Sequence, residues 1–165
     1  MRLGILSDSH NHLPETRRAL DRLLDRGAGH LVHCGDVGED VLDLLAATCL
    51  EHGIRAHVAL GNCDRAADSA FAPVPAGIER GPAPEFEFDG RRCLVLHGDR
   101  PAIVELRAAQ GGFQYLFTGH THSPAERTVG NTRILNPGSC ARSRLGPATV
   151  LLLDLATNQA EWVAL

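Results

Sequence analysis

Five short apolar runs in this chain each end in a small residue or turn that is followed by Asp, Asn or His. The polar residues that follow these runs are Asp8, Asp36, Asn62, His97 and His120. Short apolar runs without a helical period predict buried strands. Because strand carboxyl ends in an open α/β sheet face a common crevice, we expect the five polar side chains to line one pocket.

Two further histidines join this set, because His10 follows Asp8 by two residues and His122 follows His120 by two. In an extended segment, side chains two residues apart point the same way, so each pair is expected to hold one metal ion. The mixture of oxygen and nitrogen donors suits Mn²⁺, Fe²⁺ or Zn²⁺ and disfavours Ca²⁺. The complete predicted ligand set is Asp8, His10, Asp36, Asn62, His97, His120 and His122.

Seven ligands exceed the needs of a single ion, so the sequence predicts a site for two metals. Two metal ions about 4 Å apart favour phosphate ester hydrolysis, because they deprotonate water and neutralise charge on the phosphoryl oxygens. A carboxylate is the side chain best suited to bridging two cations. The central Asp36 is therefore the predicted bridge.

The rest of the chain predicts a mixed α/β fold. In the first half we expect strands over 2–6, 30–33 and 54–60, and helices over 14–26 and from about 39. The prolines at 73, 75, 82 and 84 predict an irregular crossing after Asp64. The remaining predicted elements are an antiparallel pair over 85–88 and 91–96 joined at Asp89-Gly90, a helix over 101–110, a strand over 114–117, and further strands with turns near Gly130-Asn131 and Asn158. This order predicts two packed sheets flanked by helices, in a single domain over residues 1–165.

Composition and charge exclude several kinds of function. The net charge of −4 gives no basic field for a polyanion, so a nucleic-acid polymer is not an expected partner. The chain has no lysine, which excludes lysine Schiff-base and P-loop lysine chemistry. The five cysteines form no CxxC pair, and the start MRLGILSDSH is too short an apolar run for a secretory leader or a membrane span. We therefore expect a cytoplasmic protein with reduced thiols and no membrane partner.

The ordered blocks around the predicted ligands resemble those of the calcineurin-like metallophosphoesterases. That family carries Asp-x-His, Gly-Asp, Gly-Asn-x-Asp/Glu, a His-Gly pair and Gly-His-x-His in this order, and all five blocks are present. The variant with SDSH, GNCD, GHTH and LNPGS is similar to the small bacterial and archaeal phosphodiesterase branch over nearly the whole chain.

This resemblance implies a four-layer αββα sandwich with two packed mixed β-sheets. It also implies a hydroxide, bridging two divalent ions, that attacks phosphorus in line, with Mn²⁺ expected and Fe, Zn, Ni or Co as alternatives. The implied assignment is Asp8, His10 and His122 on one metal, Asn62, His97 and His120 on the other, and Asp36 between them.

The leading hypothesis is a metal-dependent phosphodiesterase that hydrolyses a small phosphodiester or nucleotide-like compound, with phosphomonoesters as an alternative substrate class. The second hypothesis is a non-catalytic scaffold, because the retromer complex uses a subunit of this fold as an interaction module. The intact ligand set argues against that role. A nuclease is the third hypothesis, which the acidic charge disfavours. The sequence leaves a homo-oligomer open.

Two positions depart from the family pattern. Cys63 stands where many members have the histidine thought to protonate the leaving oxygen, and Asp99 stands where relatives often have a second histidine. A thiol is a poorer acid for this step near neutral pH, so Cys63 is either a passive small residue, which we favour, or a redox-sensitive one. Asp99 receives no ligand role, and it either alters the substrate rim or accepts a hydrogen bond behind the ligands.

Other polar residues near these motifs have weaker claims on function. The predicted catalytic residues are Asp36, Asn62, Cys63 and Asp64, of which Asp64 is expected to orient its loop rather than bind metal. The predicted substrate contacts are Asn62 and His12, and a plain surface-loop role is equally weighted for His12. Structural roles as packed, turn or solvated residues are expected for His30, His33, His52, His57, the segment 136–139, Arg142 and Arg144.

Overall fold

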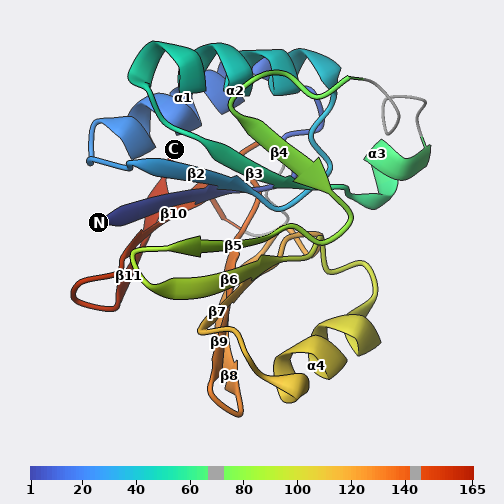
Figure 1. The fold of residues 1–165 in the computed structure, drawn as a ribbon. Helices are drawn as coiled ribbons and strands as arrows, with labels where there is room; N and C mark the ends of the chain where they lie inside the picture. The colour runs from blue at the N-terminus through green and yellow to red at the C-terminus, as the bar shows by residue number, and fades with distance from the viewer. Residues whose placement is uncertain (67–72, 142–145) are drawn as a thin grey trace.

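A computed structural model of the protein describes residues 1–66, 73–141 and 146–165. Its strands form two sheets that pack against each other, with helices on the outer face of each sheet (Figure 1). Both sheets are mixed, since each contains parallel and antiparallel pairs. The predicted four-layer αββα arrangement is confirmed.

The first sheet has six strands in the order β11-β10-β1-β2-β3-β4. These strands are β1 (Arg2–Leu6), β2 (His30–His33), β3 (Ala56–Ala59), β4 (Ile78–Gly81), β10 (Thr149–Asp154) and β11 (Gln159–Ala164). Strands β1 to β4 run parallel, whereas β10 is antiparallel to β1 and β11. The carboxyl ends of β1, β2 and β3 therefore lie at the same end of the sheet.

The second sheet has five strands in the order β5-β6-β7-β9-β8. These strands are β5 (Glu85–Phe88), β6 (Arg91–Val95), β7 (Tyr115–Phe117), β8 (Pro124–Val129) and β9 (Thr132–Pro137). Strands β6, β7 and β9 are parallel, and the edge strands β5 and β8 are antiparallel to their neighbours.

The helices divide unequally between the two sheets. On the first sheet, α1 (Leu13–Leu24) contacts β1 and β10, and α2 (Glu39–His52) contacts β3 and β4. On the second sheet, α4 (Pro101–Gln110) packs on β8 and β9. The short α3 (Asn62–Ala66) follows β3 and lies to one side of both sheets (Figure 1).

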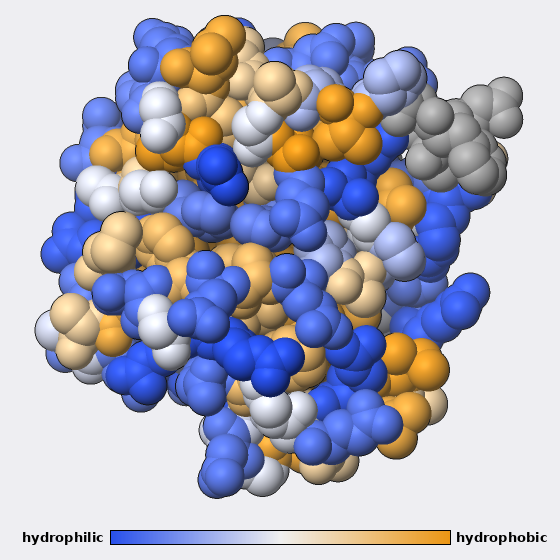
Figure 2. Space-filling model, in the orientation of Figure 1, coloured by the Kyte–Doolittle hydropathy of each residue, from blue (hydrophilic) through white to orange (hydrophobic). Residues whose placement is uncertain are grey.

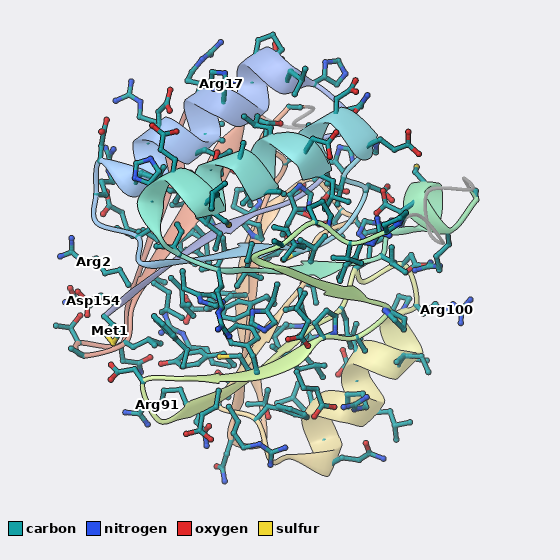
Figure 3. The ribbon with its side chains drawn as sticks, turned by 45° about the horizontal axis from the view of Figure 1, so that its top comes forward. Met1, Arg2, Arg17, Arg91, Arg100 and Asp154 are labelled. Carbon is teal, nitrogen blue, oxygen red and sulfur yellow. The ribbon has the colours of Figure 1, made fainter. Side chains whose placement is uncertain are left out.

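Three apolar layers hold these elements together. The alternation of side chains along β1 sends Leu3 and Ile5 into the layer between the sheets, while Leu6 joins the layer under α1 and α2. The third layer packs α4 on the second sheet through residues such as Val104 and Leu116. At the far end of β1, Arg2 donates a hydrogen bond to Asp154 of β10 at 3.0 Å (Figure 3).

The predicted irregular crossing after Asp64, of which residues 67–72 lie outside the described residues, is wrong at two places. Residues 62–66 form α3, and residues 78–81 form β4, which pairs in parallel with β3. The prolines that argued against structure lie outside these four strand residues, and β4 is an edge strand that needs hydrogen bonds on one side only. Other element bounds shift by one or two residues, as for α1, predicted over 14–26, and β3, predicted over 54–60.

The predicted hairpin at Asp89-Gly90 is confirmed. Strands β5 and β6 pair antiparallel, with Phe88 opposite Arg91. Asp89 and Gly90 have φ values of 52° and 71°, the left-handed conformation that a two-residue turn between twisted strands requires. Asp tolerates this conformation better than most residues, and Gly adopts it without steric cost.

On the face that Figure 2 shows, hydrophobic residues form small groups separated by hydrophilic ones, and one such group lies over α4. Exposed apolar side chains on this helix are Ile103 and Leu106. No helix among the residues that the structure describes is long and apolar enough to cross a membrane.

A pair of histidines is buried where the two sheets pack. Nε2 of His30 lies 2.8 Å from Nδ1 of His57, and Nε2 of His57 lies 3.2 Å from the carboxylate of Glu79. Phe86 of the second sheet stacks on the His57 ring at 4.1 Å between centroids. With both rings neutral, His57 donates to Glu79 and accepts from His30. Burial, helped by the charges of His57 and Arg55, lowers the pKa of His30 from 6.5 to about 4.

This lowered pKa predicts a stability that falls in mild acid. Between pH 6.5 and about 4 the unfolded chain binds a proton that folded His30 does not, so acidification across this window favours unfolding, by about 2 to 3 kcal/mol from this group. We expect His30→Gln to flatten the dependence of unfolding free energy on pH. Chemical denaturation at several pH values measures it, with the exposed His52→Gln as control. Equal slopes for His30→Gln and the wild type would contradict the prediction.

Candidate metal centre

The two sheets bring their strand carboxyl ends together in one region. The amide of Asp8, after β1, donates to the Gly35 carbonyl after β2 at 3.0 Å. The amide of His120, after β7 in the other sheet, donates to Oδ2 of Asp8 at 3.0 Å. Hydrogen bonds therefore tie the loops of both sheets to each other. The residues that follow strands β1, β2, β3, β6 and β7 in this region are Asp8, Asp36, Asn62, His97 and His120.

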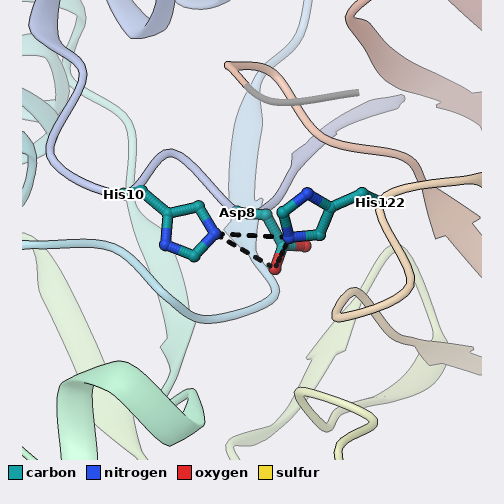
Figure 4. A group of neighbouring side chains, drawn as sticks. All are labelled: Asp8, His10 and His122. Carbon is teal, nitrogen blue, oxygen red and sulfur yellow. Dashed lines mark hydrogen bonds and ion pairs between the residues drawn. The ribbon is translucent and has the colours of Figure 1, made fainter. Parts of the chain in front are cut away.

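Asp8, His10 and His122 form the first group of converging side chains (Figure 4). Nε2 of His122 lies 3.3 Å from Oδ1 of Asp8, and Nε2 of His10 lies 4.0 Å from the same oxygen. The two Nε2 atoms are 3.3 Å apart. Three donor atoms this close together could hold one metal ion.

Asp36, Asn62 and His97 form the second group. Nε2 of His97 lies 3.1 Å from Oδ1 of Asn62 and 3.5 Å from Oδ2 of Asp36. The ring of His120 meets that of His97 edge to face, with 5.1 Å between centroids. Oδ2 of Asp36 also lies 4.0 Å from Nε2 of His10. One carboxylate oxygen therefore stands between the two groups.

The atoms of the carboxylates that face away from the centre are held by the protein. Oδ2 of Asp8 accepts hydrogen bonds from the Ser7 hydroxyl, at 2.6 Å, and from the His120 amide. Oδ1 of Asp36 accepts one from the Cys63 amide at 2.8 Å. Because these bonds fix each carboxylate, its other oxygen is aimed at the centre.

The remaining oxygen of Asp8 points to a cation. Oδ1 is buried, yet it accepts no hydrogen bond from residues 1–66, 73–141 or 146–165. An ionised oxygen in this state is costly unless a positive charge lies beside it. The neighbouring donors are two imidazoles, which are the usual companions of a carboxylate around a transition metal or zinc.

His97 gives a second indication of the same kind. Its Nδ1–H donates to the Cys34 carbonyl at 2.8 Å, which leaves a lone pair on Nε2 of the neutral ring. That lone pair faces the oxygens of Asn62 and Asp36, so a proton or a cation must separate them. Although burial opposes charge, the hydrogen bond and charge of Asp36 raise the pKa of His97, and His97 in turn holds the pKa of Asp36 well below its usual range. The residues present therefore fit metal ions.

The backbone around these side chains is unusual. Five of the seven predicted ligands have left-handed φ values between 45° and 66°, and these are Asp8, His10, Asp36, His120 and His122. The premise that each i, i+2 pair lies in an extended segment is therefore wrong. Asp8 and His10 still converge, but His120 lies against His97, whereas His122 lies with Asp8. Asp and His tolerate this conformation at a cost, and such residues cluster at functional sites.

The chain matches the family model described as the Calcineurin-like phosphoesterase superfamily domain over residues 1–158. The protein belongs to this superfamily. The phosphodiesterase MJ0936 of Methanocaldococcus jannaschii is 26% identical, with 100% of this chain and 99% of the relative covered. The phosphodiesterase YfcE of Escherichia coli K12 is 30% identical, with 93% of this chain and 88% of the relative covered.

Solved structures agree on the fold. An archaeal phosphodiesterase superposes with a TM-score of 0.86 at 24% identity, and both chains are covered completely. The YfcE phosphoesterase from E. coli superposes with a TM-score of 0.70 at 26% identity, with 99% of each chain covered. Vps29 of Entamoeba histolytica, in a complex with Zn²⁺, superposes with a TM-score of 0.63 at 21% identity over 99% of each chain. The likeness to Vps29 shows the fold alone.

Asp64 joins two loops of the candidate site and is absent from the groups of converging side chains. Its Oδ1 accepts from the amides of Val37, at 2.9 Å, and Gly38, and its Oδ2 accepts from the amide of Gly61 at 2.8 Å. These amides belong to the loops that carry Asp36 and Asn62. The structure is thus consistent with the loop-orienting role expected for Asp64.

Sequence reasoning missed the residues that brace the site from behind. Asn136, at the end of β9, donates to the Gly119 carbonyl at 2.8 Å, and the Ser139 hydroxyl donates to the Asp8 carbonyl at 2.9 Å. Ser7 was not singled out, although it bonds directly to Asp8. For Asn136 and Ser139 the available signal is the LNPGS motif at residues 135–139. Its expected role as a simple turn is incomplete, because residues 136–137 end a strand.

The two departures from the family pattern both lie at the site. Cys63 is exposed, whereas the other four cysteines are buried, and its sulfur is close to Asp36 and His10. Partial burial, together with the Asp36 carboxylate, raises the pKa of Cys63 to about 11. Asp99 forms an ion pair with Arg65 of α3. It therefore acts as an acceptor beside the ligands.

The remaining candidates lie apart from the converging groups or outside the described residues. His12 precedes α1, with its ring 4.0 Å from Glu15, and its substrate contact stays a prediction. His33 is fully buried and bonded to the Ser9 hydroxyl at 2.9 Å, as expected of a packed histidine. Arg142 and Arg144 lie outside the described residues.

Close backbone approach at Gly61 yields a test of the site. A methyl group there would lie 2.0 Å from Oδ1 of Asp36 and 2.3 Å from its amide nitrogen. We expect Gly61→Ala to displace this carboxylate, lower the metal content measured by mass spectrometry and cost about 1 to 3 kcal/mol of stability. The control is Gly81→Ala, where a methyl group would meet no atom of the described residues within 4 Å. Unchanged metal content in folded Gly61→Ala would refute the prediction.

Proposed function

We propose that this protein is a metal-dependent phosphodiesterase that hydrolyses a small phosphodiester at a site for two divalent ions, with Mn²⁺ as the expected metal. The observation that carries the proposal is the convergence of metal-competent donor atoms, above all at the buried Oδ1 of Asp8, which accepts no hydrogen bond from the described residues. Superfamily membership and two phosphodiesterase relatives support the reaction class.

The geometry supports the division of ligands that the family resemblance implied. Asp8, His10 and His122 already meet as one group, and His97 meets Asn62 and His120 as another. Asp36 is suited to the bridging role because its Oδ2 lies between His10 and His97. The proposed ligands are thus Asp8, His10, Asp36, Asn62, His97, His120 and His122.

Two bound ions would lower the pKa of the attacking water and neutralise the phosphoryl oxygens. The chain supplies the orientation that this requires. Ser7, the Cys63 amide and the Cys34 carbonyl each hold the rear atom of a ligand, so the ligand atoms are in place before substrate arrives. Asn62 is exposed as well as close to His97, which suits it to contact substrate in addition to metal.

Replacing the proposed bridge tests this function directly. Asp36→Asn keeps the size of the side chain but removes its charge, so we expect kcat/KM for bis(4-nitrophenyl) phosphate to fall at least about a hundredfold, with less bound metal and an unchanged circular dichroism spectrum. The control is Asp43→Asn, on the exposed face of α2. Full activity of Asp36→Asn would exclude this mechanism. A metal-loaded wild type that cleaves no phosphodiester would favour the scaffold alternative.

Cys63 is expected to play a passive part in proton delivery, because a thiol is a poorer acid for this step near neutral pH than an imidazolium. We expect Cys63→Ser to leave kcat/KM unchanged for diesters with either 4-nitrophenol or an unactivated alcohol as leaving group. Cys63→His should raise the rate for the unactivated ester by about tenfold or more, because an imidazolium can protonate the leaving oxygen. If Cys63→Ser slows only the unactivated ester, the thiol is the acid.

A further inference from the structure

A pocket of about 260 Å³ lies beside the candidate metal centre. Its lining includes His97, one of the proposed ligands, and the Gly98–Asp99 segment that follows it. It also includes Arg65, which lies on α3 three residues after Asn62. The pocket therefore shares His97 with the proposed ligand set, and it is the neighbouring space into which a substituent of a phosphorus ester bound at the centre would extend.

Three of the charged side chains that line this pocket, those of Arg65, Asp99 and Arg107, already have partners. Arg65 donates to the Leu60 carbonyl at 2.6 Å and forms the ion pair with Asp99. Arg107 is paired with Glu85, and its guanidinium lies 5.5 Å from the centre of the Phe113 ring. A second anionic group of a substrate would have to compete with these carboxylates for either arginine.

Arg100 also lines the pocket, and it forms no ion pair with a carboxylate of the described residues. Its side chain extends from the start of α4 away from the fold and into solvent (Figure 3). A solvated arginine in this position contributes little to binding a group inside the pocket.

The other walls of the pocket are apolar. They are formed by Pro82, Ala83, Leu96, Ile103 and Val104. Ile103 is 43% exposed, so apolar surface is left for a ligand to cover. The guanidinium of Arg65, held in place at two of its nitrogens, offers a flat face on which an aromatic ring can stack.

We propose that this pocket binds an uncharged aromatic group of the substrate, so that the enzyme prefers phosphodiesters with at least one aryl or similarly planar ester group. Apolar walls and paired arginines favour such a ring over a second anion or a small alkyl group. The proposal rests on the proposed function, which places the phosphoryl group at the metal centre.

Binding of two phosphonates that are not hydrolysed tests the proposal without requiring turnover. We expect Mn²⁺-loaded protein, studied by titration calorimetry, to bind phenylphosphonate about tenfold more tightly than methylphosphonate, a difference of about 1.4 kcal/mol. Equal affinities would overturn the proposal, as would failure of both phosphonates to bind. Tighter binding of phosphonoacetate than of phenylphosphonate would also overturn it, by indicating a site for a second anion.

Two matched variants of α4 test whether the aromatic group of the ligand lies in this pocket. Ile103 and Leu106 are both exposed on this helix, at 43% and 52%, but only Ile103 of the two lines the pocket. We expect Ile103→Asn to reduce the preference for phenylphosphonate to about twofold and Leu106→Asn to leave it unchanged. The same loss in both variants, or none in Ile103→Asn, would place the ring elsewhere.

Hydrolysis assays separate this inference from the function on which it rests. If the wild type cleaves aryl and alkyl diesters but binds the two phosphonates equally, the pocket proposal fails and the phosphodiesterase proposal stands. If it binds phenylphosphonate preferentially but cleaves no diester, the proposed function fails and the pocket remains a binding site for an aromatic group.

Discussion

The rest of this structure depends on one constraint. Carboxylate and imidazole side chains converge where the carboxyl ends of the strands in the two sheets face each other. Carboxylate and imidazole atoms of Asp8, Asp36 and His97 lie within 4.8 Å of one another, an arrangement that repels itself unless a positive charge lies between them. The fold must therefore hold these groups together against their own electrostatics. The stabilisation that offsets this repulsion comes from three apolar layers and from hydrogen bonds behind the ligands.

The unfavourable backbone conformations of the site are concentrated in its loops. Left-handed conformations at Asp8, His10 and Asp36 turn the chain sharply as it leaves each strand, which is how side chains from adjacent strands reach a common centre. Gly61 has no room for a side chain against Asp36, and Asp64 fastens the neighbouring loop through three amides. These contacts hold the loops that carry Asp36 and Asn62 against each other.

Cys63 and Asp99, the two departures from the family pattern, each have a defined contact within the site. The backbone amide of Cys63 donates a hydrogen bond that orients Asp36, whereas the thiol of Cys63 is a weak acid. Asp99 engages Arg65 and so joins α3, after the first sheet, to the loop after β6 of the second. If the centre acts as proposed, it is suited to positioning an ester and neutralising its charge more than to protonating a difficult leaving group.

The sequence by itself determined the mixed α/β class with two packed sheets, the choice of seven metal-competent candidates and the hairpin at Asp89-Gly90, because strand periodicity, residue chemistry and turn preference are local properties. Only the tertiary structure decided that β4 completes the first sheet, since a four-residue edge strand has almost no local signal and depends on pairing with β3. The tertiary structure also decided that His120 and His122 belong to different groups of side chains, because both residues have left-handed φ values in place of the extended geometry assumed for them. The hydrogen bond from the Ser139 hydroxyl to the Asp8 carbonyl joins residues 131 positions apart in the chain, so the sequence around either residue does not identify the other as its partner.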